Sequence, residues 1–168
     1  SRTRRIYIDT VNNRHVDVFL DSLVMCHTID FKGRLEVDYP TIPLAELLLE
    51  KMQIVQLTEK DVKDTLVLVR EHEVGESDQD AINSKYLAKI LSKDWGFYYT
   101  VTTNLKKIEN LVSKYIPPLS DEDMIDIKMK ITGLSEAIER EPKSLGWKIR
   151  ARIGTKQKWY RDVETLEV

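Results

Sequence analysis

The chain has 168 residues, of which 42% are apolar and 32% charged, and its formal net charge is −2. This composition is typical of one globular domain, or of two small domains that share a core, and it excludes a disordered or low-complexity chain. No apolar run is long enough to span a membrane. Cys26 is the single cysteine of the sequence and cannot form an internal disulfide, so we expect a cytoplasmic protein.

The first part of the chain predicts β-structure. It begins without an initiator Met and takes on a strand pattern within a few residues, so we expect a longer protein whose first element lies upstream. Apolar and polar residues then alternate between turns that contain Asn or Gly, which favours an antiparallel meander. A turn centred on Asn12 and Asn13 would place Asp17 opposite Ile8 and leave Asp9 on the other face. The expected strands cover 4–10, 15–20, 23–29 and 35–39.

From Pro43 onward the sequence predicts helices, because apolar residues recur at steps of three and four. Thr58 and Ser120 are each followed by an acid three residues later, which is a start signal, and Pro142 marks an end. The expected helices cover 44–55, 58–69, 82–90, 95–115, 120–142 and 144–164, with a loop over 74–80 and Gly154 inside the last helix. We therefore expect an α+β chain with a small mixed or antiparallel sheet at its N-terminus, followed by a bundle of about six helices. The expected domains are 1–73, an α/β core, and 74–168, a helical domain.

Lys51 is the first candidate functional residue, because it lies in the middle of the apolar stripe of the helix expected at 44–55. A lysine in that position must extend to solvent, pair with an acid, or face a cleft. A lysine that faces a cleft suits a phosphate group, since its ammonium is a point charge with three hydrogen-bond donors.

Acidic side chains give three further candidates, in two places of the sequence. Asp17 stands in mid-strand between Val16 and Val18, where an acid must be solvated, paired with an arginine, or bound to a metal such as Mg²⁺. Asp61 stands at the third position of the helix that begins after Thr58, where capping of the helix amides explains it without any further function. Asp64 lies one turn later, and a solvated helix face explains its presence.

At these places the sequence resembles the nucleotidyltransferase superfamily, in particular the abortive-infection (AbiEii-type) nucleotidyltransferase toxins and their relatives. The shared order is a strand with hydrophobic-Asp-hydrophobic, a helix with Leu-Leu-x-x-Lys, and a helix with Lys-Asp-x-x-Asp, and it covers about residues 4–70. The resemblance implies Mg²⁺-dependent transfer of a nucleotidyl group from a nucleoside triphosphate to an acceptor. In this comparison Asp17 matches a catalytic, metal-binding carboxylate, Lys51 matches a lysine near the triphosphate, and Asp61 and Asp64 match conserved acids of the second helix.

The sequence also departs from that family. The family's Gly-Gly or Gly-Ser loop and its first pair of carboxylates precede the matched region, and neither is present here. Transfer with two metal ions needs carboxylates that bridge both ions, which Asp17 alone cannot supply. We therefore expect this chain to be inactive by itself, either as part of a longer enzyme or as a relative that has lost catalysis.

A basic segment near the C-terminus supports an alternative function. From Lys143 to Arg161 the chain has seven basic residues and no acid, with three aromatic residues interleaved. Such a segment suits phosphates and unpaired bases, so the alternative is a non-enzymatic module that binds nucleic acid, such as RNA, or a protein partner. The segment could instead pair with the acidic helix expected at 120–142, with its aromatic residues as core anchors. The candidate nucleic-acid contacts are Lys148, Arg150, Arg152, Lys156, Lys158 and Arg161.

Overall fold

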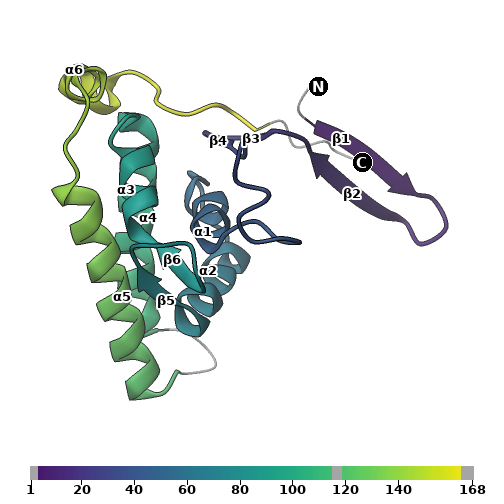
Figure 1. Ribbon diagram of the computed structural model, residues 1–168, viewed down its shortest axis with the longest axis horizontal. Coiled ribbons are helices and arrows are strands. Elements are labelled where there is room, and N and C mark those ends of the chain that lie inside the picture. Colours follow the sequence, from purple (N-terminus) through teal and green to yellow (C-terminus); the bar gives the residue numbers. More distant parts are fainter. Residues whose placement is uncertain (1–3, 115–118, 164–168) are drawn as a thin grey trace.

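A computed structural model describes residues 4–114 and 119–163 of the chain. Within these residues, helices enclose one continuous apolar core, and small sheets lie around it (Figure 1). The helices are α1 (Leu44–Met52), α2 (Glu59–Glu71), α3 (Ser84–Leu91), α4 (Trp95–Val112), α5 (Asp121–Arg140) and α6 (Leu145–Ile153). The expected α+β class and the expected number of helices are confirmed. The predicted ends of two helices, at 115 and 164, lie outside the described residues.

In the described part of the chain the strands form three separate pairs instead of the expected single meander. Two pairs are antiparallel hairpins and the third pair is parallel. The strands are β1 (Arg4–Asp9) with β2 (Arg14–Phe19), β3 (Ser22–Val24) with β4 (Thr28–Asp30), and β5 (Glu73–Gly75) with β6 (Ala81–Asn83). The loop expected at 74–80 is therefore shorter than predicted: it covers residues 76–80, between β5 and β6.

Two strand predictions are wrong for local reasons. The strand expected at 23–29 is interrupted by a tight turn, in which the amide of Met25 donates to the carbonyl of His27 at 3.0 Å. The strand expected at 35–39 is a series of turns, because the amides of Val37 and Thr41 donate to carbonyls three residues earlier. Alternation of residue type does not show whether a neighbouring strand is available, and none pairs with 35–39 in the described chain.

The β1–β2 hairpin also differs from its expected register. Asp17 lies opposite Ile6 instead of Ile8, because the connecting turn begins directly after Asp9. The carboxylate of Asp9 accepts hydrogen bonds from the amides of Val11 (2.9 Å) and Asn12 (3.2 Å), which holds that turn. Asp9 and Asp17 nevertheless lie on opposite faces, as expected.

The helices pack around α4, whose buried face contributes Phe97, Val101, Leu105 and Ile108 to the core. Helix α5 packs against α2, α3 and α4, while α1 packs against α2, α3, α4 and β6. Each fully buried side chain of this size stabilises the fold by roughly 1.5–3 kcal/mol. The core is continuous between the two expected domains, and their division at residue 73 stays a prediction. No helix of the described chain is both long enough and apolar enough to cross a membrane.

Two of the helix starts follow the predicted signals. The side-chain oxygen of Thr58 accepts from the amide of Asp61, whose own carboxylate accepts from the Thr58 amide, so both orphan donors are satisfied at the start of α2. Ser120 caps α5 by accepting from the amide of Asp123 at 3.1 Å. The C-terminal end of α1 is capped by a residue far away in the sequence: the Asn104 side chain of α4 donates to the Met52 carbonyl at 2.9 Å.

The last helix is shorter than expected and ends at Ile153. Gly154 adopts a φ of +61°, a conformation that glycine tolerates and that cannot continue a right-handed helix. The guanidinium of Arg150 donates to the Gly154 carbonyl at 2.7 Å and closes the helix end. The sequence prediction that placed Gly154 inside a longer helix is therefore wrong.

Candidate functional site

Among the four residues of the family resemblance, Lys51 and Asp64 form an ion pair that the structure describes. The Lys51 amine of α1 lies 2.7 Å from the Asp64 carboxylate of α2, and the two side chains are 32% and 37% exposed. Of the three alternatives for Lys51, the described structure thus shows pairing with an acid. The hydrogen bond from Lys51 holds the pKa of Asp64 below its usual value, so this carboxylate stays ionised at neutral pH. The pair leaves two of the three ammonium donors free for a ligand.

Asp61 has a structural role that accounts for its position. Its carboxylate accepts from both the amide (3.0 Å) and the hydroxyl (2.7 Å) of Thr58, and the residue is 9% exposed. These contacts complete the capping box of α2. Asp61 therefore supports the helix that presents Asp64.

Asp17 lies apart from this pair, on strand β2. Its two carboxylate oxygens accept from the guanidinium of Arg4 at 2.9 and 3.2 Å, and its side chain is 37% exposed. Within the described residues, no hydrogen bond or ion pair joins Asp17 to Lys51, Asp61 or Asp64. Both non-metal alternatives for Asp17, solvent exposure and an arginine partner, are present in the structure.

The described residues do not by themselves fit a Mg²⁺ site. Across 4–114 and 119–163, no three His, Cys, Asp or Glu side chains are grouped so that they could hold a metal ion. Asp17 supplies one carboxylate, and Arg4 occupies both of its oxygens. Since a divalent ion in a phosphoryl-transfer site needs one or more free carboxylates together with substrate oxygens, we derive no metal-dependent step from this part of the chain.

The basic C-terminal segment docks on α4 through its aromatic residues. The indole nitrogen of Trp159 donates to the hydroxyl of Thr100 at 3.0 Å, and its ring meets the edge of Tyr99 with centroids 5.1 Å apart. Trp147 makes a similar edge contact with Tyr98 at 5.0 Å. In Figure 1 the segment after α6 crosses from that helix to the side of β3 and β4. Trp147 and Trp159 therefore anchor the segment on α4, although neither is part of the buried core, contrary to the expectation from the sequence.

The expected pairing between this basic segment and the acidic helix is wrong. In the described chain the ion pairs of α5 go to its own residues, to Arg70 of α2 and, through Lys130, to Glu73 of β5. Lys143 donates to backbone carbonyls at the end of α5, including that of Glu141 at 2.9 Å. The cationic groups beyond Lys143 therefore remain uncompensated by α5.

Half of the candidate nucleic-acid residues gather around one cavity of about 480 Å³. Arg150, Lys158 and Arg161 line it, together with aromatic, polar and acidic groups that include Trp159, Tyr160 and Asp94. The guanidinium of Arg161 donates to the hydroxyl of Thr28 at 2.6 Å, and its amide donates to the carbonyl of Cys26 at 3.0 Å. Lys148, Arg152 and Lys156 are not among the lining residues.

A close backbone approach holds this cavity in shape. A Cβ atom on Gly96 would lie 2.5 Å from the carbonyl oxygen of Trp159, so only glycine fits beneath the crossing segment. The guanidinium of Arg150 lies 4.8 Å from the centroid of the Trp95 ring, in a cation–π contact. The cavity wall thus combines the start of α4 with the returning C-terminal segment.

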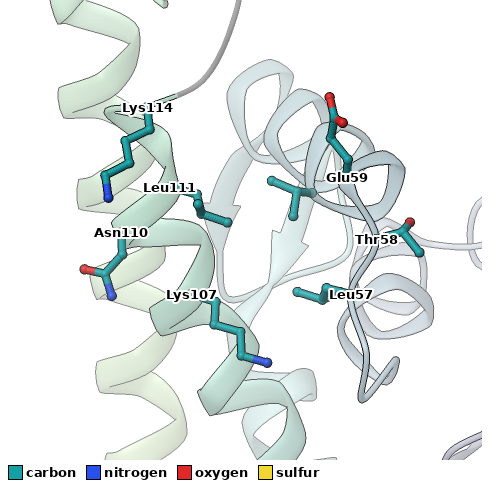
Figure 2. A pocket seen from close by; sticks show the side chains of 8 residues that line it. Leu57, Thr58, Glu59, Lys107, Asn110, Leu111 and Lys114 are labelled. Carbon is teal, nitrogen blue, oxygen red and sulfur yellow. The ribbon is translucent and has the colours of Figure 1, made fainter.

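A larger cleft of about 600 Å³ lies between α4 and the start of α2, and none of the predicted site residues lines it. Figure 2 shows Leu57 and Leu111 on opposite sides of this cleft, with Lys107 and Lys114 on the α4 side. Lys107 and Leu111 share one face of α4, and Lys114 continues the spacing of four and three just beyond the end of that helix. That spacing is equally typical of a packed helix face, so the sequence contains no signal that identifies the cleft.

Sequence reasoning also missed a buried ionic cluster around Arg34. The Arg34 guanidinium bonds the carboxylates of Glu46 on α1 and of Asp78, the latter at 2.7 Å, and lies 3.8 Å from the centroid of the Tyr86 ring. Glu46 is fully buried and Arg34 is 14% exposed. The hydrogen bond from Arg34 lowers the pKa of Asp78, while burial and then Glu46 raise the pKa of Tyr86. The cluster ties the turns after β4 to α1 and α3.

No family model, curated protein or solved structure matches this chain.

Proposed function

We propose that this chain provides the nucleotide-phosphate-binding part of a nucleotidyltransferase-type protein. The observation that carries the proposal is the Lys51–Asp64 pair, which brings together one residue from each of the two helical motifs of the resemblance. Asp64 limits the motion of the Lys51 side chain, and two ammonium donors remain for phosphate oxygens. Because both side chains are about one third exposed, the pair stabilises the fold little, and a function for it is separable from folding.

The test is a calorimetric titration of the chain with ATP, CTP, GTP and UTP, each in the presence of Mg²⁺. We expect at least one of the four to bind, and Lys51→Ala to weaken that binding about 10- to 100-fold, which is the effect of losing one charge-assisted hydrogen bond. Lys128→Ala is the matched control, since it also removes a lysine that makes one side-chain hydrogen bond, to Ser113 at 3.0 Å. Failure of all four nucleotides to bind, or equal binding by Lys51→Ala, would contradict the proposal.

A second candidate function is binding of single-stranded nucleic acid at the cavity of the basic segment. The observation that favours it is the convergence of Arg150, Lys158 and Arg161 beside Trp159 and Tyr160. Cationic groups attract the phosphate backbone, and aromatic rings that reach the surface stack on bases; the rings of Trp159 and Tyr160 are half-buried. The Asp94 carboxylate in the same wall, and the Asp162 carboxylate that is ion-paired with Lys158, reduce the local positive charge, so we expect modest, salt-dependent affinity.

Fluorescence anisotropy with a labelled single-stranded RNA, without nucleotide or Mg²⁺, tests this second candidate. Lys158→Gln removes a charge at the cavity, and it is expected to weaken binding and to lower the slope of log affinity against log salt by about 1. Lys156→Gln removes the same charge two residues away, outside the cavity lining, and is expected to have the smaller effect. Equal effects of the two variants would rule out the cavity as the binding site.

A further inference from the structure

The β1–β2 hairpin has an open edge that carries exposed apolar side chains. Ile6, Tyr7 and Ile8 of β1 are 42%, 53% and 61% exposed. Within the described residues β1 pairs with β2 alone, so its outer edge presents unpaired backbone donors and acceptors. Figure 1 shows the hairpin projecting away from the helices. A two-stranded ribbon is marginally stable alone, and further strands stabilise it.

The sequence of β1 is complementary to itself in one antiparallel register. With Tyr7 on the two-fold axis, Arg5 lies opposite Asp9 of a second copy, and Ile6 lies opposite Ile8 of that copy. Each of these pairs occurs twice because of the symmetry. Arg5, Tyr7 and Asp9 share one face of the strand, and Ile6 and Ile8 share the other. On one face each arginine thus lies opposite an aspartate, and on the other face each isoleucine lies opposite an isoleucine. Both kinds of cross-strand pair stabilise a strand pair.

Neighbouring registers lack this complementarity. With Ile6 on the axis, Arg5 would lie opposite Tyr7 of the second copy and Arg4 opposite Ile8. With Ile8 on the axis, Asp9 would lie opposite Tyr7. A one-residue shift would place residues of opposite faces against each other, so it is excluded in a continuous sheet. One register alone therefore satisfies both faces of β1.

The charged groups needed for this register are available. The side chain of Arg5 makes no hydrogen bond or ion pair with any residue that the structure describes. Asp9 Oδ2 accepts one hydrogen bond, from the Asn12 side chain at 2.7 Å, and can accept another. The outer edge of β2 is less suitable, because its acid, Asp17, already binds Arg4 through both oxygens.

We propose that β1 pairs edge to edge with β1 of a second copy of this chain, which gives a four-stranded antiparallel sheet in the order β2–β1–β1–β2. Charge complementarity between Arg5 and Asp9 selects the second copy as the occupant of this edge. The contact is smaller than a standard protein interface, so the dimer is weak and forms reversibly. This inference does not rest on nucleotide binding at Lys51.

Sedimentation velocity of the full chain between about 10 μM and 1 mM tests the proposal, since a weak interface populates in this range. We expect a concentration-dependent dimer. Arg5→Glu places two carboxylates opposite each other at both ends of the strand pair and is expected to shift the dissociation constant upward at least tenfold. Lys85→Glu makes the same charge change on the exposed side of α3 and is expected to leave the dimer unchanged. A monomer at about 1 mM, or equal dimers of all three proteins, would overturn the proposal.

Disulfide trapping tests the register itself, in a Cys26→Ser background. Residue 7 lies on the axis, so Tyr7→Cys is expected to form a covalent dimer under mild oxidation, because directly opposed Cβ atoms come within about 4.5–5.5 Å. Val16→Cys is the control, since Val16 faces Tyr7 within the same hairpin but lies on the far strand. Equal crosslinking at the two positions would mean random association and would overturn the register. The Lys51→Ala variant should dimerise like the wild type, which separates this result from nucleotide binding.

Discussion

Arg34→Met is expected to lower the free energy of unfolding by about 3–5 kcal/mol, the largest single-residue effect that we predict. The reason is that Glu46 is fully buried and would lose its cationic partner while it remains shielded from water. Asp78 would lose its bond to the same guanidinium, although it is more exposed. Urea unfolding at pH 7, followed by circular dichroism, measures the change.

Two further variants make this result interpretable. Arg34→Met combined with Glu46→Gln removes both charges and retains a hydrogen-bonding group near Tyr86, so it should recover a large part of the lost stability. Arg140→Met breaks the exposed pair between Arg140 and Glu136, whose side chains are 75% and 59% exposed, and should cost less than about 0.5 kcal/mol. If Arg34→Met alone lowered the free energy of unfolding by less than about 1 kcal/mol, the ionic cluster would not have the stabilising role that its geometry indicates.

Acidification from pH 7 to pH 4.5 is expected to remove about 2 kcal/mol of stability through His27 alone. Burial lowers the pKa of His27 to about 4, with Arg161 acting in the same direction and Asp94 against it. Between pH 6.5 and pH 4 the unfolded chain therefore binds a proton that the folded chain does not bind. The stability contribution of the neutral ring is complete above pH 6.5 and is lost as the pH falls through this window.

The hydrogen bonds around His27 explain why the ring stays neutral. The Thr100 hydroxyl lies 2.9 Å from His27 Nε2 and donates its own proton to the Gly96 carbonyl at 3.1 Å, so Nε2 carries the ring hydrogen. The ring also stacks on Phe97, with centroids 4.8 Å apart, in a site with no acceptor for a second proton among its described contacts. Protonation would place a charge in that buried site, which the Asp94 carboxylate offsets only in part.

Urea unfolding at a series of pH values isolates this effect by comparison with His27→Gln. The difference in free energy of unfolding between wild type and variant should shrink by about 2 kcal/mol from pH 7 to pH 4.5. Carboxylates whose pKa is lowered, such as Asp78, lose their contribution at lower pH, as the pH falls through values below 3.8, and they are common to both proteins. Parallel stability curves for the two proteins would contradict the assignment to His27.

The helices could be predicted from the sequence because their signals are local. Capping residues at Thr58 and Ser120 and the regular apolar spacing lie within a few residues of the helices that they define. The strands could be predicted only in part, because a strand depends on which segment pairs with it. The 35–39 segment has the alternation of a strand, but among the described residues no strand pairs with it, and it contributes only an isolated bridge from Asp38 to Thr41. Gly154 follows helical residues but has a positive φ.

The candidate site could be predicted residue by residue but not as an arrangement. The apolar surroundings of Lys51 left three alternatives for its amine: solvent, an acid or a cleft. The structure shows an acid, and the identity of that acid, Asp64, depends on how α1 and α2 pack. The Arg34 cluster could not be predicted from the sequence, since its members come from four separate segments. The functional roles of Lys51 and Asp17 stay predictions.

The contact between the C-terminal segment and the β3–β4 turn can form only late in the synthesis of this protein. Arg161 and Thr28 are 133 residues apart, and at ordinary synthesis rates this distance corresponds to roughly 7–27 s of translation. During that interval α1 to α5 can form, while the turn at Cys26 and His27 lacks the Trp159 and Arg161 groups that cover it. In a newly made chain this turn therefore stays uncovered until Trp159 and Arg161 have been synthesised and have left the ribosome.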